Sequence, residues 1–373
     1  MYIYDIVSAE LFSEIRLPEC FDDFLLSENA EPERTVPEAA VLVTVRQKPD
    51  SEENAASYPH RGFTVSELSD GSWLYEADDG TALLCDSEYR RLKLFRADGA
   101  CDDSISEVLR LALECRLTLS GGVALHCACV EKDGFAVAFS GKSGLGKSTR
   151  AGNWVDCLGA RWISGDRPAI LPAQKVAFGA PWDGKEKIHK NISAPLAAVF
   201  EVRRAPFTTV RKLSERQAFG FLTSQCFVPM WDSTAAAFAL ANLRALTKNI
   251  PVYRLFCDMD EKAARETYNF IFHENEKILK EERDVKLKDG FVLRGIAGEH
   301  LLMPTGENIT KYSGSVALNE VSAFIVEKLK EPLSKDDLLE FILAEYDVDR
   351  ETAKKDLDAL LAKLREYELL DEE

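Results

Sequence analysis

The chain has 373 residues, of which 46% are hydrophobic and 29% charged, as expected of a globular protein with sizeable cores. Its formal net charge of −17 disfavours nucleic acid or an anionic membrane as the main partner, since both require a basic surface, whereas a basic peptide or ordinary surface acidity fits. No segment approaches the ~20 apolar residues of a membrane helix, no basic signal-peptide start is present, and the nine cysteines lack Cys-x-x-Cys spacing, so we expect a cytoplasmic chain with reduced thiols.

Residues 1 to 120 alternate short apolar runs with turns, which predicts strands followed by one helix. Residues 41–45 form a strand between two polar loops, and residues 73–75 and 82–85 are expected to pair as a hairpin. Residues 91–95 alternate as a half-buried strand does, and residues 104–119 repeat apolar side chains with a helical period. This region shows no catalytic constellation.

The most specific motif of the chain follows a hairpin of two apolar strands at 121–130 and 135–140. It fits G-x-x-x-x-G-K-[ST] at Gly141, Gly146, Lys147 and Ser148, and a helix is expected after it. Glycines let backbone N–H groups surround a phosphate, and the helix start adds its positive dipole end. The motif therefore predicts a nucleotide-phosphate site, although ATPases, GTPases and kinases share it. The candidate nucleotide-binding residues are Gly141, Ser143, Gly144, Leu145, Gly146, Lys147, Ser148 and Thr149.

Four side chains around this loop are candidates for chemistry. Lys147 supplies a charge to the β- and γ-phosphates, and the Ser148 hydroxyl is placed to bind Mg²⁺. His126 lies 15 residues before Gly141, so a regular hairpin would bring it beside the loop, although a lone histidine in an apolar strand is more often a core residue. Asp166 ends the strand after the loop helix, where a Mg²⁺-binding or proton-accepting carboxylate is expected; a turn residue is the alternative.

The remainder of this domain is predicted to alternate strands and helices. Residues 178–191 mix Gly, Pro, Trp182, cations and a carboxylate in one loop, which suits either ligand contact or a polar surface. Strands are expected at 195–201 and 249–257, and helices at 217–223, 234–246 and 259–272.

A charge-dense connector at 273–284 separates the domain 1–272 from a second domain at 285–373. Here we predict strands at 285–293, 299–303 and 309–311, then three helices, at 318–328, from a cap at Ser334 to 346, and from a cap at Asp349 to 367. The last helix carries an apolar seam. This order indicates a small winged-helix-like α+β module for binding, although its acidity disfavours DNA.

His126, the loop Gly141–Thr149 and Ile163-Ser-Gly-Asp166 together resemble the HPr serine kinase/phosphorylase family. The resemblance covers about 120 to 170, and more loosely 1 to 272. It implies an α/β, phosphoenolpyruvate-carboxykinase-like P-loop fold with a mixed sheet, with ATP and Mg²⁺ as cofactors. It also implies catalytic roles for His126, Asp166 and Lys147, with Ser148 and Asp166 as metal ligands. The family's paired aspartates appear here as Gly165-Asp166, so the base is either Asp166 or His126, and HPr is not expected as substrate.

Residues from about 285 to 370 resemble the pyrroloquinoline-quinone biosynthesis protein D family. The matching landmarks are 312–320, ending in Leu318-Asn-Glu320, and the closing helix 356–370. The resemblance implies binding of the leader segment of a ribosomally made precursor peptide, added as an extra strand to the small sheet.

Together the two resemblances predict a kinase that phosphorylates a hydroxyl, first of all of serine, on a peptide tethered by the second domain. The partners expected are therefore a leader peptide, with a homo-oligomer left open, and neither nucleic acid nor a membrane. Three alternatives remain: a small-metabolite kinase of the same fold, a peptide-delivery protein whose nucleotide site is a switch or inert, and a transcriptional regulator.

Overall fold

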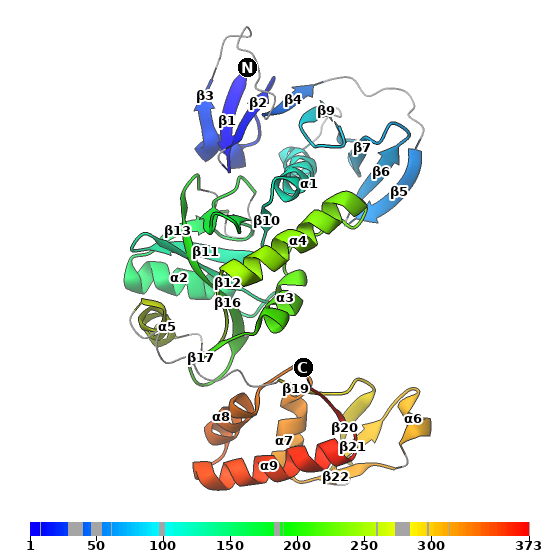
Figure 1. Cartoon of the computed structure of the whole chain (residues 1–373), viewed down its shortest axis with the longest axis vertical. Helices are drawn as coiled ribbons and strands as arrows, with labels where there is room; N and C mark the ends of the chain where they lie inside the picture. The colour runs from blue at the N-terminus through cyan, green and yellow to red at the C-terminus, as the bar shows by residue number, and fades with distance from the viewer. Residues whose placement is uncertain are drawn as a thin grey trace. The chain divides into compact units, whose positions relative to one another are not determined.

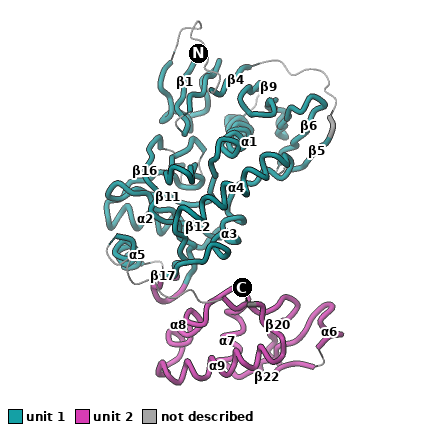
Figure 2. Tube along the Cα trace, viewed as in Figure 1, with its two compact units in different colours: residues 1–204, 210–255, 259–277 teal, residues 205–209, 256–258, 278–373 magenta. Residues whose placement is uncertain are grey.

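The computed structural model describes residues 1–7, 9–28, 40–45, 54–60, 62–96, 101–182, 187–188, 190–258, 260–272, 284–296, 298–312 and 314–372. The chain divides into two compact units (Figure 2). The first comprises Met1–Arg204, Val210–Leu255 and Met259–Lys277, and the second Ala205–Thr209, Phe256–Asp258 and Ile278–Glu373. The two short segments, which the sequence analysis placed in the first domain, belong to the second unit because Phe207 and Phe256 pack against Phe341.

The first unit begins with a sheet of nine strands among the described residues, in the order β3-β1-β2-β4-β9-β8-β7-β6-β5 (Figure 1). The predicted hairpin is confirmed, since Tyr75 pairs with Leu83 in antiparallel register. The strands and the short 3-10 helix between them are β1 (Tyr2–Ile6), β2 (Ala9–Ser13), η1 (Glu19–Phe24), β3 (Leu25–Ser27), β4 (Val41–Val45), β5 (Asn54–His60), β6 (Phe63–Leu68), β7 (Trp73–Ala77), β8 (Ala82–Cys85) and β9 (Arg91–Phe95).

A second sheet carries the glycine loop. Its order is β10-β14-β15-β16-β12-β11-β13, with β18 paired to β16 and β17 paired to β18. It is mixed, as predicted, because β12 pairs antiparallel with β11 and parallel with β16. The strands are β10 (Val123–Ala124), β11 (Cys127–Lys132), β12 (Phe135–Ser140), β13 (Arg161–Ser164), β14 (Ala169–Leu171), β15 (Val176–Phe178), β16 (Ser193–Arg204), β17 (Thr209–Lys212) and β18 (Val252–Cys257).

Helices cover both faces of this second sheet. Phe139 of β12 packs against Trp154 of α2 (Lys147–Leu158), whose neighbour is α5 (Lys262–Phe272). The preceding residue, Ala138, points to the opposite face, where it belongs to the core with Leu222 of α3 (Glu215–Thr223) and Leu243 of α4 (Ser233–Asn249). Helix α1 (Asp102–Leu119) packs against β7, β8, β10 and α4, and thereby joins the two sheets into one unit.

Among the described residues, the second unit combines a three-stranded sheet with four helices. The sheet has the order β20-β21-β22, and a separate pair is formed by β19 and β23. The capping box predicted at Ser334 and the cap predicted at Asp349 are confirmed, and Leu357 and Leu361 of the predicted seam are buried. The elements are β19 (Val285–Leu287), β20 (Phe291–Ile296), β21 (Glu299–Pro304), α6 (Asn308–Lys311), β22 (Val316–Leu318), α7 (Glu320–Lys328), α8 (Lys335–Glu345), α9 (Arg350–Glu366) and β23 (Leu370–Glu372).

Two predictions about this unit are wrong. The strand expected at 285–293 is two strands: β19 ends at Leu287, and the chain bends at Gly290, whose φ is 86°, before β20 starts at Phe291. The strand expected at 309–311 is the short helix α6, and the third strand is instead β22, at residues assigned in part to the first helix. Both predictions were made from short apolar runs alone, whereas the structure of such runs depends on pairing with distant strands.

The chain is a mixed α/β protein, as expected, with mixed and antiparallel sheets. Across the residues that the structure describes, every helix is too short or too polar to cross a membrane.

Candidate functional site

The glycine loop has the strand–loop–helix context that its motif requires. Strand β12 ends at Ser140, and α2 begins at Lys147. Gly141, Gly144 and Gly146 adopt φ values of 148°, 83° and 90°. A Cβ at Gly141 would also approach the Val202 backbone oxygen to 3.1 Å. The loop conformation therefore depends on glycine in its backbone angles and, at Gly141, in the space beside β16.

Polar groups of the loop and its surroundings converge on its backbone. Lys147 Nζ donates to the carbonyl oxygens of Gly141 at 2.9 Å and Lys142 at 3.4 Å. Arg204 Nη2 donates to the carbonyl oxygen of Gly144 at 3.0 Å. Of the other candidate residues, Ser143 and Gly144 are exposed, Leu145 and Ser148 are half-buried, and Thr149 is exposed in the first turn of α2. The loop is thus open to solvent, with a lysine ammonium spanning it.

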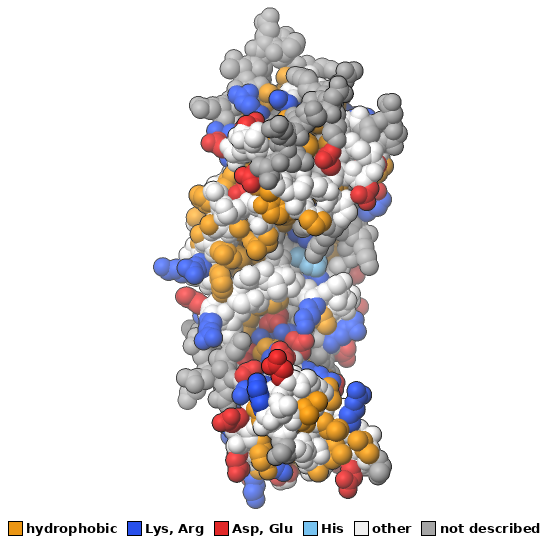
Figure 3. Space-filling view, turned by 90° about the vertical axis from the view of Figure 1, so that its right-hand side faces the viewer, with side chains coloured by type: hydrophobic (Ala, Val, Ile, Leu, Met, Phe, Trp, Pro, Cys, Tyr) orange, Lys and Arg blue, Asp and Glu red, His pale blue; other side chains and the backbone are white. Residues whose placement is uncertain are grey.

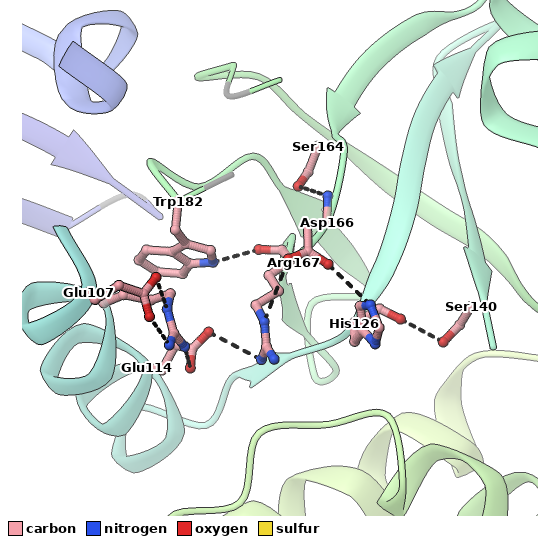
Figure 4. Close-up of polar contacts among 9 residues, drawn as sticks. Glu107, Glu114, His126, Ser140, Ser164, Asp166, Arg167 and Trp182 are labelled. Carbon is pink, nitrogen blue, oxygen red and sulfur yellow. Dashed lines mark hydrogen bonds and ion pairs between the residues drawn. The ribbon is translucent and has the colours of Figure 1, made fainter. Parts of the chain in front are cut away.

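The predicted neighbours His126 and Asp166 meet beside this loop. The hairpin pairs Cys127 with Ser140, and the Ser140 hydroxyl donates to the His126 carbonyl oxygen at 2.8 Å. The Cys127 N–H donates to the Asp166 carbonyl oxygen at 2.7 Å. These backbone contacts bring the side chains together, and His126 Nε2 lies 3.3 Å from Asp166 Oδ1 (Figure 4). The expectation that the hairpin would bring His126 to the end of β12, where the loop starts, is confirmed.

Both side chains of this pair are accessible. The exposed fraction is 33% for the His126 side chain and 26% for that of Asp166, so a substrate group could reach either. Gly165, which precedes Asp166, provides no second carboxylate, and its N–H donates to the Ile188 carbonyl oxygen at 3.3 Å. Among the described residues, the contacts at this point therefore bring together one carboxylate, Asp166, and one imidazole, His126.

A chain of alternating charges, which was not predicted from the sequence, leads from α1 to Asp166. Arg110 donates to Glu107 and, at 2.9 Å, to Glu114 Oε2. Glu114 Oε1 lies 3.6 Å from Arg167 Nη1, and Arg167 Nε lies 3.8 Å from Asp166 Oδ2 (Figure 4). The Glu114 side chain is completely buried, and this burial raises the pKa of its carboxyl although the two arginines oppose the effect.

A second buried carboxylate lies at the end of the strand beside the loop. Glu201 of β16 pairs in register with Ser140 of β12. Its two oxygens accept hydrogen bonds from Arg203 Nε at 2.7 Å and Arg254 Nε at 2.8 Å. Burial pushes the pKa of Glu201 upward, but the Arg254 and Arg203 guanidiniums outweigh it and hold that pKa below its usual range. This cluster lies on β16 next to Val202, whose backbone oxygen leaves little room for a Cβ at Gly141.

Sequence signals for these two carboxylates existed but were weak. Glu114 falls on the apolar arc of α1, between Leu111 and Thr118, where a charge is unexpected. Glu201 ends an apolar strand that was recognised, but its pairing with β12 depends on the sheet order. Burial and partner choice are tertiary properties, which a single sequence does not display.

The loop predicted at 178–191 is only partly placed. Trp182 is buried and donates from Nε1 to the Arg167 carbonyl oxygen at 2.8 Å, so it supports the backbone next to Asp166. Lys190 Nζ lies 2.7 Å from Asp23 Oδ2. Residues 183–186 and 189 lie outside the described residues. Among the described residues, no three His, Cys, Asp or Glu side chains cluster as a metal centre.

The second unit has a groove of its own. A cavity of about 540 Å³ runs between β22 and the end of α9, and it is lined by residues of the three-stranded sheet, by Lys311, Tyr312, Gly314 and Ser315, and by residues at and just after the end of α9. Lys311 and Lys363 are its charged lining residues, and no carboxylate lines it in the described part of the chain. Figure 3 shows hydrophobic side chains gathered on the visible face of this unit among charged ones. The lining residues are Phe291, Leu302, Pro304, Lys311, Tyr312, Gly314, Ser315, Val316, Ala317, Lys363, Tyr367 and Leu369.

Comparison with known proteins concerns this second unit. Residues 299–370 match the family described as coenzyme PQQ synthesis protein D (PqqD), so they form a PqqD-like domain. The resemblance inferred from the sequence is thereby confirmed for this part of the chain. No curated protein matches the chain.

Two solved structures are similar over the same fraction of the chain. TbiB1 in complex with the TbiA(β) leader peptide is 30% identical, with 23% of this chain and 94% of that chain covered and a TM-score of 0.20. Lasso peptide synthetase B1 complexed with its leader peptide is 25% identical, with 23% and 96% covered and a TM-score of 0.20.

Proposed function

We propose that the chain is an ATP-dependent kinase that phosphorylates a hydroxyl group, in the first place of serine, on a ribosomally made precursor peptide held by its PqqD-like domain. The observation that carries the proposal is the His126–Asp166 pair, 3.3 Å apart at the end of the strands that hold the glycine loop. The PqqD match supplies the expected class of substrate, because that family's resemblance implies leader-peptide binding.

The same proposal extends to the finer fold. The mixed sheet with β12 parallel to β16 and antiparallel to β11 suits a phosphoenolpyruvate-carboxykinase-like P-loop domain of the HPr kinase type. Helices α7, α8 and α9 and the small sheet of the second unit suit a winged-helix-like module.

The loop residues fit a nucleotide. Positive-φ glycines leave the loop backbone open, and α2 starts at the loop, so its first N–H groups and Lys147 suit the phosphates of ATP. Gly141, Ser143, Gly144, Leu145, Gly146, Lys147, Ser148 and Thr149 would provide these contacts.

The same end of the sheet fits Mg²⁺. Ser148 and Asp166 would hold the ion, and a cluster of protein ligands is not needed because Mg²⁺ usually keeps several waters and binds substrate phosphates. When bound, Mg²⁺ neutralises charge on the transferred phosphoryl group. This assignment gives Asp166 two roles, as a ligand and as a group oriented toward His126.

The proposed reaction transfers the γ-phosphoryl group of ATP to the peptide. The hydroxyl oxygen forms the new bond to the γ-phosphorus, the bond from that phosphorus to the β,γ-bridging oxygen breaks, and ADP leaves. The hydroxyl proton passes to His126 or Asp166, which are both accessible.

The groove of the second unit suits the leader of the peptide. Strand β22 pairs with β21, and it forms an outer strand of the sheet in the described part of the chain, so an extended segment could add to it. Phe291, Tyr312 and Tyr367 offer apolar and aromatic contact to the leader, while Lys311 and Lys363 favour an acidic residue in it. These two lysines stand out against the domain as a whole, because residues 284–373 contain 12 Lys and Arg against 21 Asp and Glu.

Replacing loop lysines tests the catalytic half of the proposal. A candidate precursor peptide encoded beside the gene is incubated with the protein, ATP and Mg²⁺. Lys147→Ala is expected to abolish phosphorylation, since the charge on the phosphates is lost. Lys142→Ala is the control, because Lys142 is an exposed residue of the same loop that the motif does not specify. Turnover that survives in Lys147→Ala contradicts the kinase assignment.

Reversing the groove charges tests the peptide-binding half. Lys311→Glu combined with Lys363→Glu is expected to weaken peptide binding at least about tenfold, because two attractions become repulsions in a partly enclosed groove. The matched control is Lys354→Glu combined with Lys355→Glu, on exposed positions of the same helix α9. Equal affinity in both double variants, measured by calorimetry, contradicts binding in this groove.

Gly165 favours one alternative function. If a carboxylate at this position is indispensable for proton transfer, the chain is a peptide-delivery protein whose nucleotide site acts as a switch. Binding of both nucleotide and peptide without ATP consumption would support that alternative.

A further inference from the structure

The charged chain between α1 and Asp166 contains a buried carboxylate that the proposed reaction does not use. Glu114 is completely buried, whereas Glu107 at the outer end of the chain is 43% exposed. A buried ion pair is seldom a net source of stability, because apolar residues of similar volume are often as good or better. Fold stability therefore does not explain why a carboxylate occupies this position on α1.

The distances show what Glu114 does to Arg167. The Arg167 guanidinium is 3.6 Å from Glu114 and 3.8 Å from Asp166, both longer than a hydrogen bond of about 3.2 Å or less. Its backbone is fixed separately by the hydrogen bond from Trp182 Nε1. The position of this side chain is therefore set by the balance between two carboxylates.

Burial determines which of the two carboxylates attracts the Arg167 guanidinium more strongly. Glu114 is screened by no solvent, whereas the Asp166 side chain is 26% exposed, so at similar distance the attraction from Glu114 is the stronger. Among the described residues, no hydrogen bond reaches Glu114 Oε1, the oxygen directed at Arg167, while Oε2 accepts from Arg110. Arg110 also donates to Glu107, whose side chain is 43% exposed.

We propose that Glu114 is a positioning residue that holds Arg167 away from full ion pairing with Asp166, so that Asp166 remains directed at His126. Without that restraint the guanidinium closes onto Asp166 as a bidentate pair and occupies the oxygens that the reaction needs. The inference rests on the proposed function, because it takes Asp166 as a working group. It adds a residue of α1 to a site otherwise built from the second sheet.

Crystal structures of Glu114→Gln and of the control Glu107→Gln test the geometry without any ligand. In Glu114→Gln the amide keeps a hydrogen bond with Arg110 but loses its charge, so we expect the Arg167–Asp166 separation to shorten to about 3 Å. In Glu107→Gln it stays near the present 3.8 Å. An unchanged separation in Glu114→Gln overturns the proposal. If that variant does not fold, Glu114→Met, which fills the space with an apolar chain, serves in its place.

Kinetics of five proteins test the consequence: wild type, Glu107→Gln, Glu114→Gln, Arg167→Gln and the Glu114→Gln/Arg167→Gln double variant. We expect Glu114→Gln to lower kcat of peptide phosphorylation about tenfold or more with KM for ATP changed less than about twofold. The double variant is expected to recover the kcat of Arg167→Gln, because the interfering cation is gone. Independent losses that multiply in the double variant, or a kcat for Glu114→Gln equal to that of Glu107→Gln, contradict the proposal. A wild type without phosphorylation contradicts the proposed function instead, and the crystal structures still decide the role of Glu114.

Discussion

Glu114 and Glu201 are two buried carboxylates in the same unit, each between two arginines, and they behave in opposite ways. Both oxygens of Glu201 accept short hydrogen bonds, from Arg203 and Arg254. Glu114 has one such bond, from Arg110, and a longer contact of 3.6 Å with Arg167. The pKa of Glu201 is lowered although burial opposes it, whereas burial raises that of Glu114.

The difference shows that counting arginines does not determine the state of a buried carboxylate. Hydrogen bonds to both oxygens replace the water that Glu201 has lost, so its charge is stabilised. Glu114 keeps an incompletely satisfied charge, which is what allows it to act on Arg167. The first cluster holds the strand beside the glycine loop, and the second acts on a side chain of the candidate site.

Removing Glu201 is expected to give the largest effect. Glu201→Ala leaves Arg254, which is 7% exposed, with its buried charge uncompensated, so unfolding should become easier by about 3–5 kcal/mol. Urea denaturation followed by circular dichroism measures the change. A loss below about 1 kcal/mol would mean that the two hydrogen bonds do not compensate for burial.

Removing Glu114 is expected to cost less. In Glu114→Ala, Arg110 retains Glu107 and the partly exposed Arg167 retains Asp166, so about 1–3 kcal/mol of stability should be lost. The same urea denaturation applies. If the loss equals that in Glu201→Ala, the contrast between the two carboxylates is contradicted.

The two carboxylates should also respond oppositely to pH. The pKa of Glu201 is lower in the folded than in the unfolded chain. Its ionised carboxylate therefore stabilises the fold above the unfolded-state pKa of about 4.3, and this contribution is lost as pH falls through the native pKa. The raised pKa of Glu114 means that its ionisation subtracts stability as pH rises from about 4.3 to the native pKa.

Urea denaturation at a series of pH values between about 3 and 7 compares wild type with each alanine variant. The stability advantage of wild type over Glu201→Ala should increase with pH, and that over Glu114→Ala should decrease. Parallel curves for the two variants would show that hydrogen bonding does not separate them.

The smallest effect is expected at the outer end of the charged chain. Glu107 is 43% exposed, and its pair with Arg110 is open to water, so Glu107→Gln should change the unfolding free energy by less than about 1 kcal/mol. A larger loss would mean that the series of charged side chains from Glu107 to Asp166 stabilises the fold as one unit.

Much of the loop end of the first unit could be predicted because its signals are local. The glycine motif defines a strand, a turn and a helix within 24 residues, from 135 to 158, and the hairpin spacing placed His126 at its start. Helix caps at Ser334 and Asp349 are equally local, since a side chain bonds a backbone N–H three residues on.

Other features depend on distant parts of the chain. Strand β19 pairs with β23, whose Leu370 opposes Leu287, and no local pattern indicates that partner. Glu114 and Glu201 became visible as functional candidates only when packing showed their burial and partners. A sequence pattern gives the types of residue, whereas the balance of charge around Arg167 is set by distances of a few tenths of an ångström.

The most direct test of the account is the intact mass of a precursor peptide after incubation with the full chain, ATP and Mg²⁺, compared with the same peptide lacking its leader. The account predicts a gain of ~80 Da, one phosphoryl group, on the full precursor and much slower gain on the truncated one, since tethering is lost. Equal phosphorylation of both peptides would contradict capture by the PqqD-like domain. No gain on either, with ATP binding shown separately, would contradict the kinase assignment.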